Sequence, residues 1–232
     1  MADEKVSILV QLIDKVSGAA KGITSSLKDM LTSINPLTIG MAGLTAAIGY
    51  TIKAAEESRR IMAQTNAVLK STGYAAGVTA TQISSLATEF SEMTNFDDEA
   101  VQSAENLILT FTNINKKIFP ETTAIVLDMS AALGQDFKSS AIQVGKALQD
   151  PITGLTALRR VGVNFTDAQK DQIKAMVESG RVMEAQKVIL KELETEFGGS
   201  AKAQASGIKI LRNALQNLAE DTGGIFLPKI DA

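Results

Sequence analysis

The stretch from Met30 to Ile52 carries no charged side chain, and this feature most constrains the fold of the chain. So long an uncharged run is not typical of a helix that water covers on one side, because such a helix carries a charged face. Three structures fit it: a membrane span, a buried core helix, or a surface for other copies of the same helix. Length allows a span, but Gly40, Gly43 and Gly49 dilute the hydrophobicity and leave a marginal insertion signal.

Small residues in this stretch favour close helix packing over membrane insertion. Ala42 and Ala46, and likewise Gly43 and Ala47, are four residues apart, a spacing that lets a second backbone approach. Asn35 followed by proline is typical of a helix start, and no helix breaker follows before residue 73. We therefore expect one helix over residues 35–71, more than about 50 Å long at 1.5 Å per residue.

The segment before Asn35 shows apolar residues at alternating spacings of three and four, which is typical of a helix that packs along one seam. Its opening, Val6 to Ile13, is β-branched enough that a short leading strand remains an alternative. We expect the seam and the small residues together to mediate self-association. The residues predicted for this role are Leu9, Ile13, Val16, Ile23, Leu27, Gly40, Ala42, Gly43, Ala46 and Ala47.

Residues 73–199 read as a compact α-helical domain of short amphipathic helices. Thr79 with Gln82, and Thr166 with Gln169, have the spacing of capping boxes, and Asp97 precedes another helix as a cap. Apolar residues at helical spacing are expected to face the core. They are Ile83, Leu86, Ala87, Phe90, Met93, Ala104, Leu107, Ile108, Phe111, Ile125, Val126, Met129, Leu133, Ala141, Val144 and Leu148.

The chain is predicted to be all-α, in three parts. Residues 1–72 form the long helical oligomerisation region, residues 73–199 the compact domain, and residues 200–232 a linker with the start of a further helix. The segment Gly198 to Gly207 reads as a flexible joint, and Ile208, Leu211, Leu215 and Leu218 then recur at helical spacing.

Composition excludes several functions. A net charge of −3 offers no surplus of cations for phosphates, so specific nucleic-acid binding is not expected. The chain has no Cys and no His, which removes a thiolate nucleophile, the commonest general base and the commonest zinc or iron ligand. The acidic run at 97–99 is better explained as a helix N-terminus, and Arg59–Arg60 and Arg159–Arg160 as solvated or helix-end cations. Gly145–Lys146 lacks the first glycine of a phosphate loop, where Ser140 stands. We expect no enzyme, no cofactor and no metal.

One long stretch resembles the N-terminal region of phage tail tape measure proteins. The resemblance rests on "SSAIQVGKALQDPITGLTALRRVGVNFTDAQKDQIKAMVESGRVMEAQKVILKELETEFGGSAKAQA", and upstream on "LIDKVSGAAKGI" and "AAEESRRIMAQTNAVLKSTG" in the same order. It extends to about Phe226 and carries no catalytic residues. Even as one unbroken helix the chain would reach only about 350 Å, so we expect a portion of a longer ruler, a truncated prophage product, or the ruler of a short tail.

The resemblance implies a structural protein that scaffolds assembly of the tail tube, sets tail length and assists genome delivery. Its implied partners are further copies of itself, the tail tube, baseplate or tail-tip proteins, tail assembly chaperones, and the host membrane at ejection. Its implied location is the virion tail, after assembly in the host cytoplasm. Two alternatives stay open: a membrane-active, pore-forming or holin-like protein, and a helical adaptor without catalysis. A hydrolase is the weakest reading.

Overall fold

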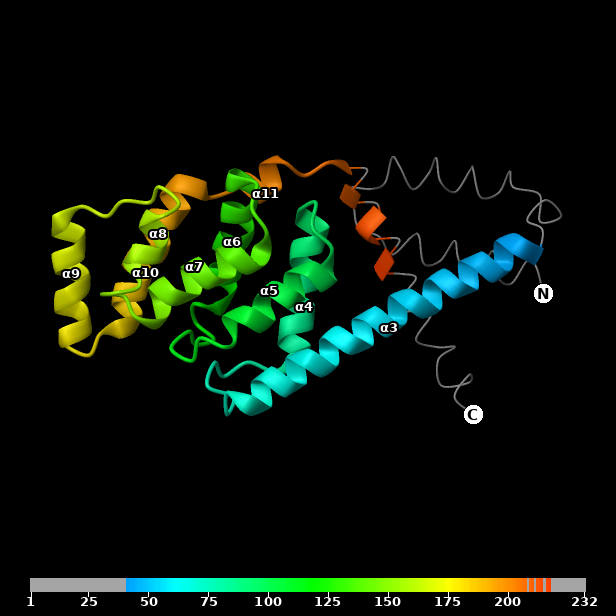
Figure 1. The fold of residues 1–232 in the computed structure, drawn as a ribbon, viewed down its shortest axis with the longest axis horizontal. Coiled ribbons are helices and arrows are strands. Elements are labelled where there is room, and N and C mark those ends of the chain that lie inside the picture. Colours follow the sequence, from blue (N-terminus) through cyan, green and yellow to red (C-terminus); the bar gives the residue numbers. More distant parts are fainter. Residues whose placement is uncertain (1–40, 208, 211, 215, 218–232) are drawn as a thin grey trace. The chain divides into compact units, whose positions relative to one another are not determined.

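The structure, a computed structural model, describes residues 41–207, 209–210, 212–214 and 216–217 (Figure 1). This part of the chain is helical and contains no strand, which confirms the all-α prediction for it. The leading strand, the N-terminal seam and the apolar positions of the last expected helix lie outside the described residues. By its contacts the chain divides into two units: residues 1–59 with 207–232, and residues 60–206.

Helix α3 (Met41–Ser71) is the described part of the long helix expected from the sequence. With 31 residues it is about 46 Å long. It ends where the sequence indicates, because Gly73 adopts a positive φ of 62° and the Tyr74 amide donates to the Leu69 carbonyl at 2.8 Å. In the second unit its buried side chains recur every four residues, at Ile61, Thr65 and Leu69.

The helices of the second unit pack mainly around α5 and α10. Helix α5 packs against α4, α6 and α7, helix α10 packs against α6, α7 and α9, and α8 and α11 cover α7 and α6 respectively. In Figure 1, α9 lies at the left edge of this unit. The bounds are α4 (Ala80–Met93), α5 (Asp98–Ile108), α6 (Phe119–Leu133), α7 (Phe137–Gln149), α8 (Leu155–Arg159), α9 (Asp167–Glu178), α10 (Val182–Phe197) and α11 (Ser200–Ala203).

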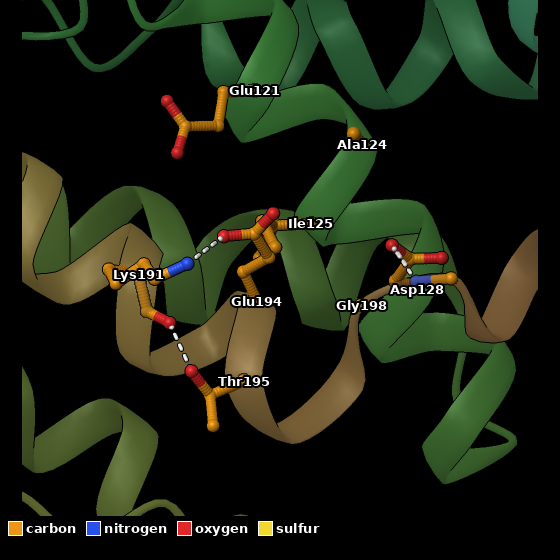
Figure 2. A pocket seen from close by; sticks show the side chains of 9 residues that line it. Glu121, Ala124, Ile125, Asp128, Lys191, Glu194, Thr195 and Gly198 are labelled. Atoms are coloured by element: carbon orange, nitrogen blue, oxygen red, sulfur yellow. Dashed lines mark hydrogen bonds and ion pairs between the residues drawn. The ribbon is translucent and has the colours of Figure 1, made fainter.

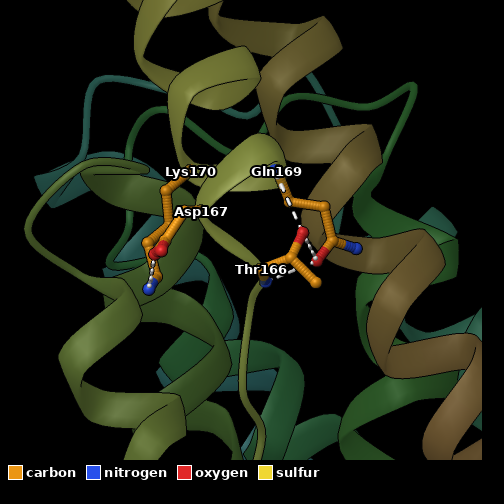
Figure 3. Close-up of polar contacts among 4 residues, drawn as sticks. All are labelled: Thr166, Asp167, Gln169 and Lys170. Atoms are coloured by element: carbon orange, nitrogen blue, oxygen red, sulfur yellow. Dashed lines mark hydrogen bonds and ion pairs between the residues drawn. The ribbon is translucent and has the colours of Figure 1, made fainter.

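The predicted caps are present. The Thr166 hydroxyl accepts the Gln169 amide proton at 3.2 Å, and the Gln169 side chain accepts the Thr166 amide proton at 2.8 Å (Figure 3). Thr79 and Gln82 make the same pair of bonds at the start of α4. Asp97 accepts the Ala100 amide proton at 2.7 Å and so caps α5. Each cap satisfies amide groups that have no partner inside the helix.

The core of the second unit contains most of the residues that helical spacing selected. Ile83, Ala104, Ile108 and Leu148 are fully buried, and Ile125, Val126, Met129, Ala141 and Val144 accompany them. Two predictions are wrong: Met93 is 36% exposed and Leu133 is 39% exposed. Each is the last residue of its helix, and burial at a helix end depends on how far the neighbouring helices reach.

The segment expected to be a flexible joint contains a short helix. Helix α11 packs against α6, and Ala201 at its centre is only 4% exposed. Gly199 precedes it with a φ of 80°, a conformation that glycine adopts without strain. Residues 200–206 therefore belong to the compact second unit in this structure.

Candidate functional site

A pocket of about 390 Å³ lies between α6 and α10 (Figure 2). Charged side chains dominate its polar surface, with Lys191 and Glu194 paired across 3.0 Å on one wall. Ala124 and Ile125 supply apolar surface. The complete lining is Glu121, Ala124, Ile125, Asp128, Lys191, Glu194, Thr195, Gly198 and Gly199.

The side chains of Thr195 and Asp128 in this pocket form hydrogen bonds with backbone groups of the fold. The Thr195 hydroxyl donates to the Lys191 carbonyl at 2.9 Å, so no base takes its proton. Both carboxylate oxygens of Asp128 accept backbone amide protons, from Gly199 and Ala201, at 2.9 Å each. The pocket has the composition of a solvated groove between helices and offers no activated nucleophile.

A second pocket, of about 410 Å³, lies between α4 and the start of α6. Val78, Ile83, Leu86, Phe119 and Pro120 make one side apolar. Gln82, Glu89 and Lys116 line it as well, together with Thr81 and Ser85. The sequence marked Gln82 as part of a capping box and Ile83 and Leu86 as core residues, but it gave no signal of a groove at this place.

Glu105 is the most perturbed acidic group of the second unit. Its side chain is 0% exposed, and burial raises its pKa to about 9, so it is protonated at neutral pH. The Thr123 hydroxyl opposes this rise in pKa without offsetting it, and it donates its proton to the Phe119 carbonyl at 3.1 Å. Neither oxygen of Glu105 has a hydrogen-bond partner within the described part of the chain, and the neighbouring Asn106 amide shares this condition.

Perturbed acids often mark active sites, but this one lies in a closed core. Glu105 lines neither of the two pockets. The sequence prediction overlooked it, although Val101, Glu105 and Ile108 share one helical stripe. This stripe was the signal in the sequence that could have shown Glu105 to be buried. A carboxyl buried in the core stays neutral, and its main effect is on stability.

The acidic run at the start of α5 divides between two environments. Asp97 is the cap, as predicted, whereas burial raises the pKa of Asp98 to about 7, with the Glu99 carboxylate adding to the effect. Favourable interaction with the helix terminus alone would lower that pKa, so burial outweighs it. Among the described residues, no group of three acidic side chains is arranged to hold a metal ion.

The other residues singled out in the sequence occupy ordinary helical positions. Gly145 lies inside α7, so it forms no phosphate loop. Arg159 is in the last turn of α8 and Arg160 caps it, as expected. Arg59 and Arg60 lie in the middle of α3 with exposed side chains.

Only part of the predicted self-association surface falls within the described residues. Ala42, Gly43, Ala46 and Ala47 lie on α3, where the helical backbone places each member of a pair one turn from the other. Leu9, Ile13, Val16, Ile23, Leu27 and Gly40 lie outside. No helix in the described part of the chain combines the length and apolar character of a membrane span.

Comparison with known proteins gives a match to a family model. A family model described as "Prophage tail length tape measure protein" matches residues 10–174, which is well over half of the chain. The matched range contains α3 and the helices from α4 to α8, and it ends within α9. No match was found among curated proteins or among solved structures.

Proposed function

Since this chain belongs to the family of prophage tail length tape measure proteins, we propose that it scaffolds assembly of the tail tube and sets tail length. Its family membership gives it a structural role in a phage tail, in association with other tail components. The observation that carries the proposal is the match over residues 10–174, which includes the longest helix of the described chain.

The proposed mechanism depends on helix geometry. A helix gains about 1.5 Å for each residue, so helical segments convert gene length into physical distance. Helix α3 supports this reading, because 31 residues continue without a break. The compact second unit contributes little length and is suited to docking against a tube, baseplate, tail-tip or chaperone protein.

A ruler made of helices needs neighbours, because a single long helix cannot bury its apolar surface alone. We propose that copies associate through the small-residue face of α3 at Ala42, Gly43, Ala46 and Ala47, together with the N-terminal seam. Close approach at small residues is a common mode of helix pairing. The family resemblance also supports departure of the protein with the genome at ejection.

The experiment is an insertion in the phage that encodes the chain. A helix-forming segment of about 36 residues, ten turns, placed between Glu57 and Ser58 of α3 should lengthen each tail by about 54 Å. The matched control places the same segment in the turn at Gly180, between α9 and α10, where it adds no length to the ruler. Electron microscopy of purified tails measures the difference, and equal tail lengths in the two insertions would contradict the ruler mechanism.

A further inference from the structure

Residues 199–206, here called the latch, form the end of the second unit. Hydrogen bonds that involve side chains hold them to the rest of that unit. Asp128 of α6 accepts the amide protons of Gly199 and Ala201, each at 2.9 Å. The Gln204 side chain donates to the Ala131 carbonyl of the same helix at 2.9 Å. These bonds join segments about 70 residues apart in the chain, as their positions show.

Asn95 holds the far end of the latch. Its side-chain oxygen accepts the Ser206 amide proton at 2.8 Å, and its side-chain nitrogen donates to the Gln204 carbonyl. One amide side chain thus pairs with the backbone on both sides of Ala205. Ser206 is the last residue of the second unit, so Asn95 fixes the point where the chain leaves it.

The apolar contribution of the latch is small. Ala201 is its one deeply buried apolar side chain, at 4% exposure. It completes a separate apolar cluster with Ala87, Val101 and Leu127, against which Phe96 and Phe137 also pack. A single methyl group buries little apolar area, so the hydrogen bonds that the latch makes with Asp128 and Asn95 decide whether it stays closed.

The root of the latch consists of two consecutive glycines, of which Gly199 has open space around it. A Cβ on Gly198 would lie 2.4 Å from the Glu194 carbonyl oxygen, so this position requires glycine. Gly199 has a φ of 80° and nothing within 4 Å of an added Cβ. Both glycines line the open pocket between α6 and α10, so space is available on that side.

We propose that the latch opens as a unit about Gly198 and Gly199 while the rest of the second unit stays folded. Opening breaks the bonds to Asp128, Asn95 and Ala131 and withdraws Ala201, which uncovers the apolar cluster beneath it. The conformation of the hinge glycines makes this motion accessible without disturbing α10. The exit of the chain from the second unit then has two states, fastened and released.

The test uses thiol labelling of the full chain, which has no cysteine of its own. The variant A201C reports latch opening, and A104C, in α5 at 1% exposure, is the matched control in the core. We expect the thiol of A201C to label at least about tenfold faster than the thiol of A104C under native conditions. Adding N95A removes two hydrogen bonds and should speed the labelling of A201C about tenfold, leaving the labelling of A104C unchanged.

Amide hydrogen exchange of the unsubstituted chain gives a second readout that needs no mutation. The amides of Gly199, Ala201 and Ser206 should exchange faster than those of α5 and α7 and respond less to denaturant. Equal rates for the latch and core amides, or equal labelling of the A201C and A104C variants, would overturn the proposal, because both mean that the latch opens only when the unit unfolds.

Discussion

The ring of Phe111 lies directly against the backbone of Gly145, where an added Cβ would be 2.1 Å from Phe111 Cε2. Gly145 is in the interior of α7, a position where alanine normally stabilises a helix by about 1 kcal/mol. The ring takes the space that a side chain would need. This contact explains why residue 145 is glycine. In the sequence alone, Gly145 was only part of an imperfect match to a phosphate loop.

We predict that G145A destabilises the second unit, with overpacking of about 1–3 kcal/mol outweighing the gain in helix propensity. Chemical denaturation followed by circular dichroism measures the change. In an F111L background the same substitution should become neutral or stabilising, because the smaller side chain leaves room. A cost that is the same in both backgrounds would show that the Phe111 ring is not the cause.

Glu105 makes the stability of the second unit depend on pH. Its folded pKa of about 9 lies above the ordinary value of 4.5. The free energy of unfolding is therefore not reduced by ionisation of Glu105 below about pH 4.5, where this group is protonated in both the folded and the unfolded chain. Between pH 4.5 and pH 9 the free energy of unfolding falls, because Glu105 ionises in the unfolded chain but stays protonated in the folded one. The loss is complete once the pH passes 9. The loss of stability at pH 7 is about 3 kcal/mol, because pH 7 lies 2.5 pH units above the ordinary pKa of 4.5 and each unit costs about 1.4 kcal/mol.

We predict that E105Q removes most of this decline and stabilises the protein at pH 7, because the amide stays neutral at every pH. Asp98, whose pKa is also raised, keeps a smaller decline in the variant. Denaturation at a series of pH values between 4 and 10 measures the profile. E121Q makes the same replacement of Glu by Gln at an exposed position of α6 and should retain the wild-type decline.

The two capping boxes provide a matched pair of substitutions. Gln82 and Gln169 play the same capping role, but Gln169 also donates to the Glu192 carboxylate of α10 at 2.6 Å. We predict that Q169A costs about 1 kcal/mol more than Q82A, since it loses the bond between helices as well as the cap. Urea titrations of the two variants measure the difference, and equal costs would mean that the bond to Glu192 contributes nothing.

The small-residue face of α3 is tested by replacing two of its alanines with the larger leucine. We predict that A42L/A46L weakens self-association, because leucine side chains keep the partner backbone at a distance. The control is A63L/A67L, which places the same two leucines four residues apart on an exposed part of the same helix. Sedimentation velocity should show smaller species for the first pair alone.

A larger change tests the same surface. Deleting residues 40–52 should abolish self-association and leave the compact second unit folded, as judged by its cooperative unfolding. Oligomers that persist at unchanged size after the deletion would rule out this surface.

Local signals in the sequence predicted much of the second unit. Thr79, Asp97 and Thr166 marked helix starts because a cap is a local hydrogen bond between near neighbours. Gly134 and Gly180 follow the ends of α6 and α9 with positive φ angles, a conformation that glycine adopts without strain. Apolar periodicity selected most of the core, and it failed for Met93 and Leu133, where burial depends on how far a neighbouring helix extends.

Features that depend on distant contacts could not be predicted in this way. The flexible-joint reading of residues 198–207 considered only glycine and small residues, whereas Asp128 and Asn95 lie about 70 to 110 residues earlier. Glu105 was overlooked because a carboxyl on a helix is usually exposed. Only the packing of α4, α6 and α7 around α5 shows that it is enclosed.

Helix α9 packs chiefly against α10, and Ile173 is its one fully buried residue. Most of its other residues are exposed in this structure. In a lineage of such chains, mutations should accumulate on this outer helix sooner than on α5, and extra residues should be tolerated best at the Gly180 turn. The outer face of α9 and the turn at Gly180 are where a phage could diversify this protein without rebuilding its interior.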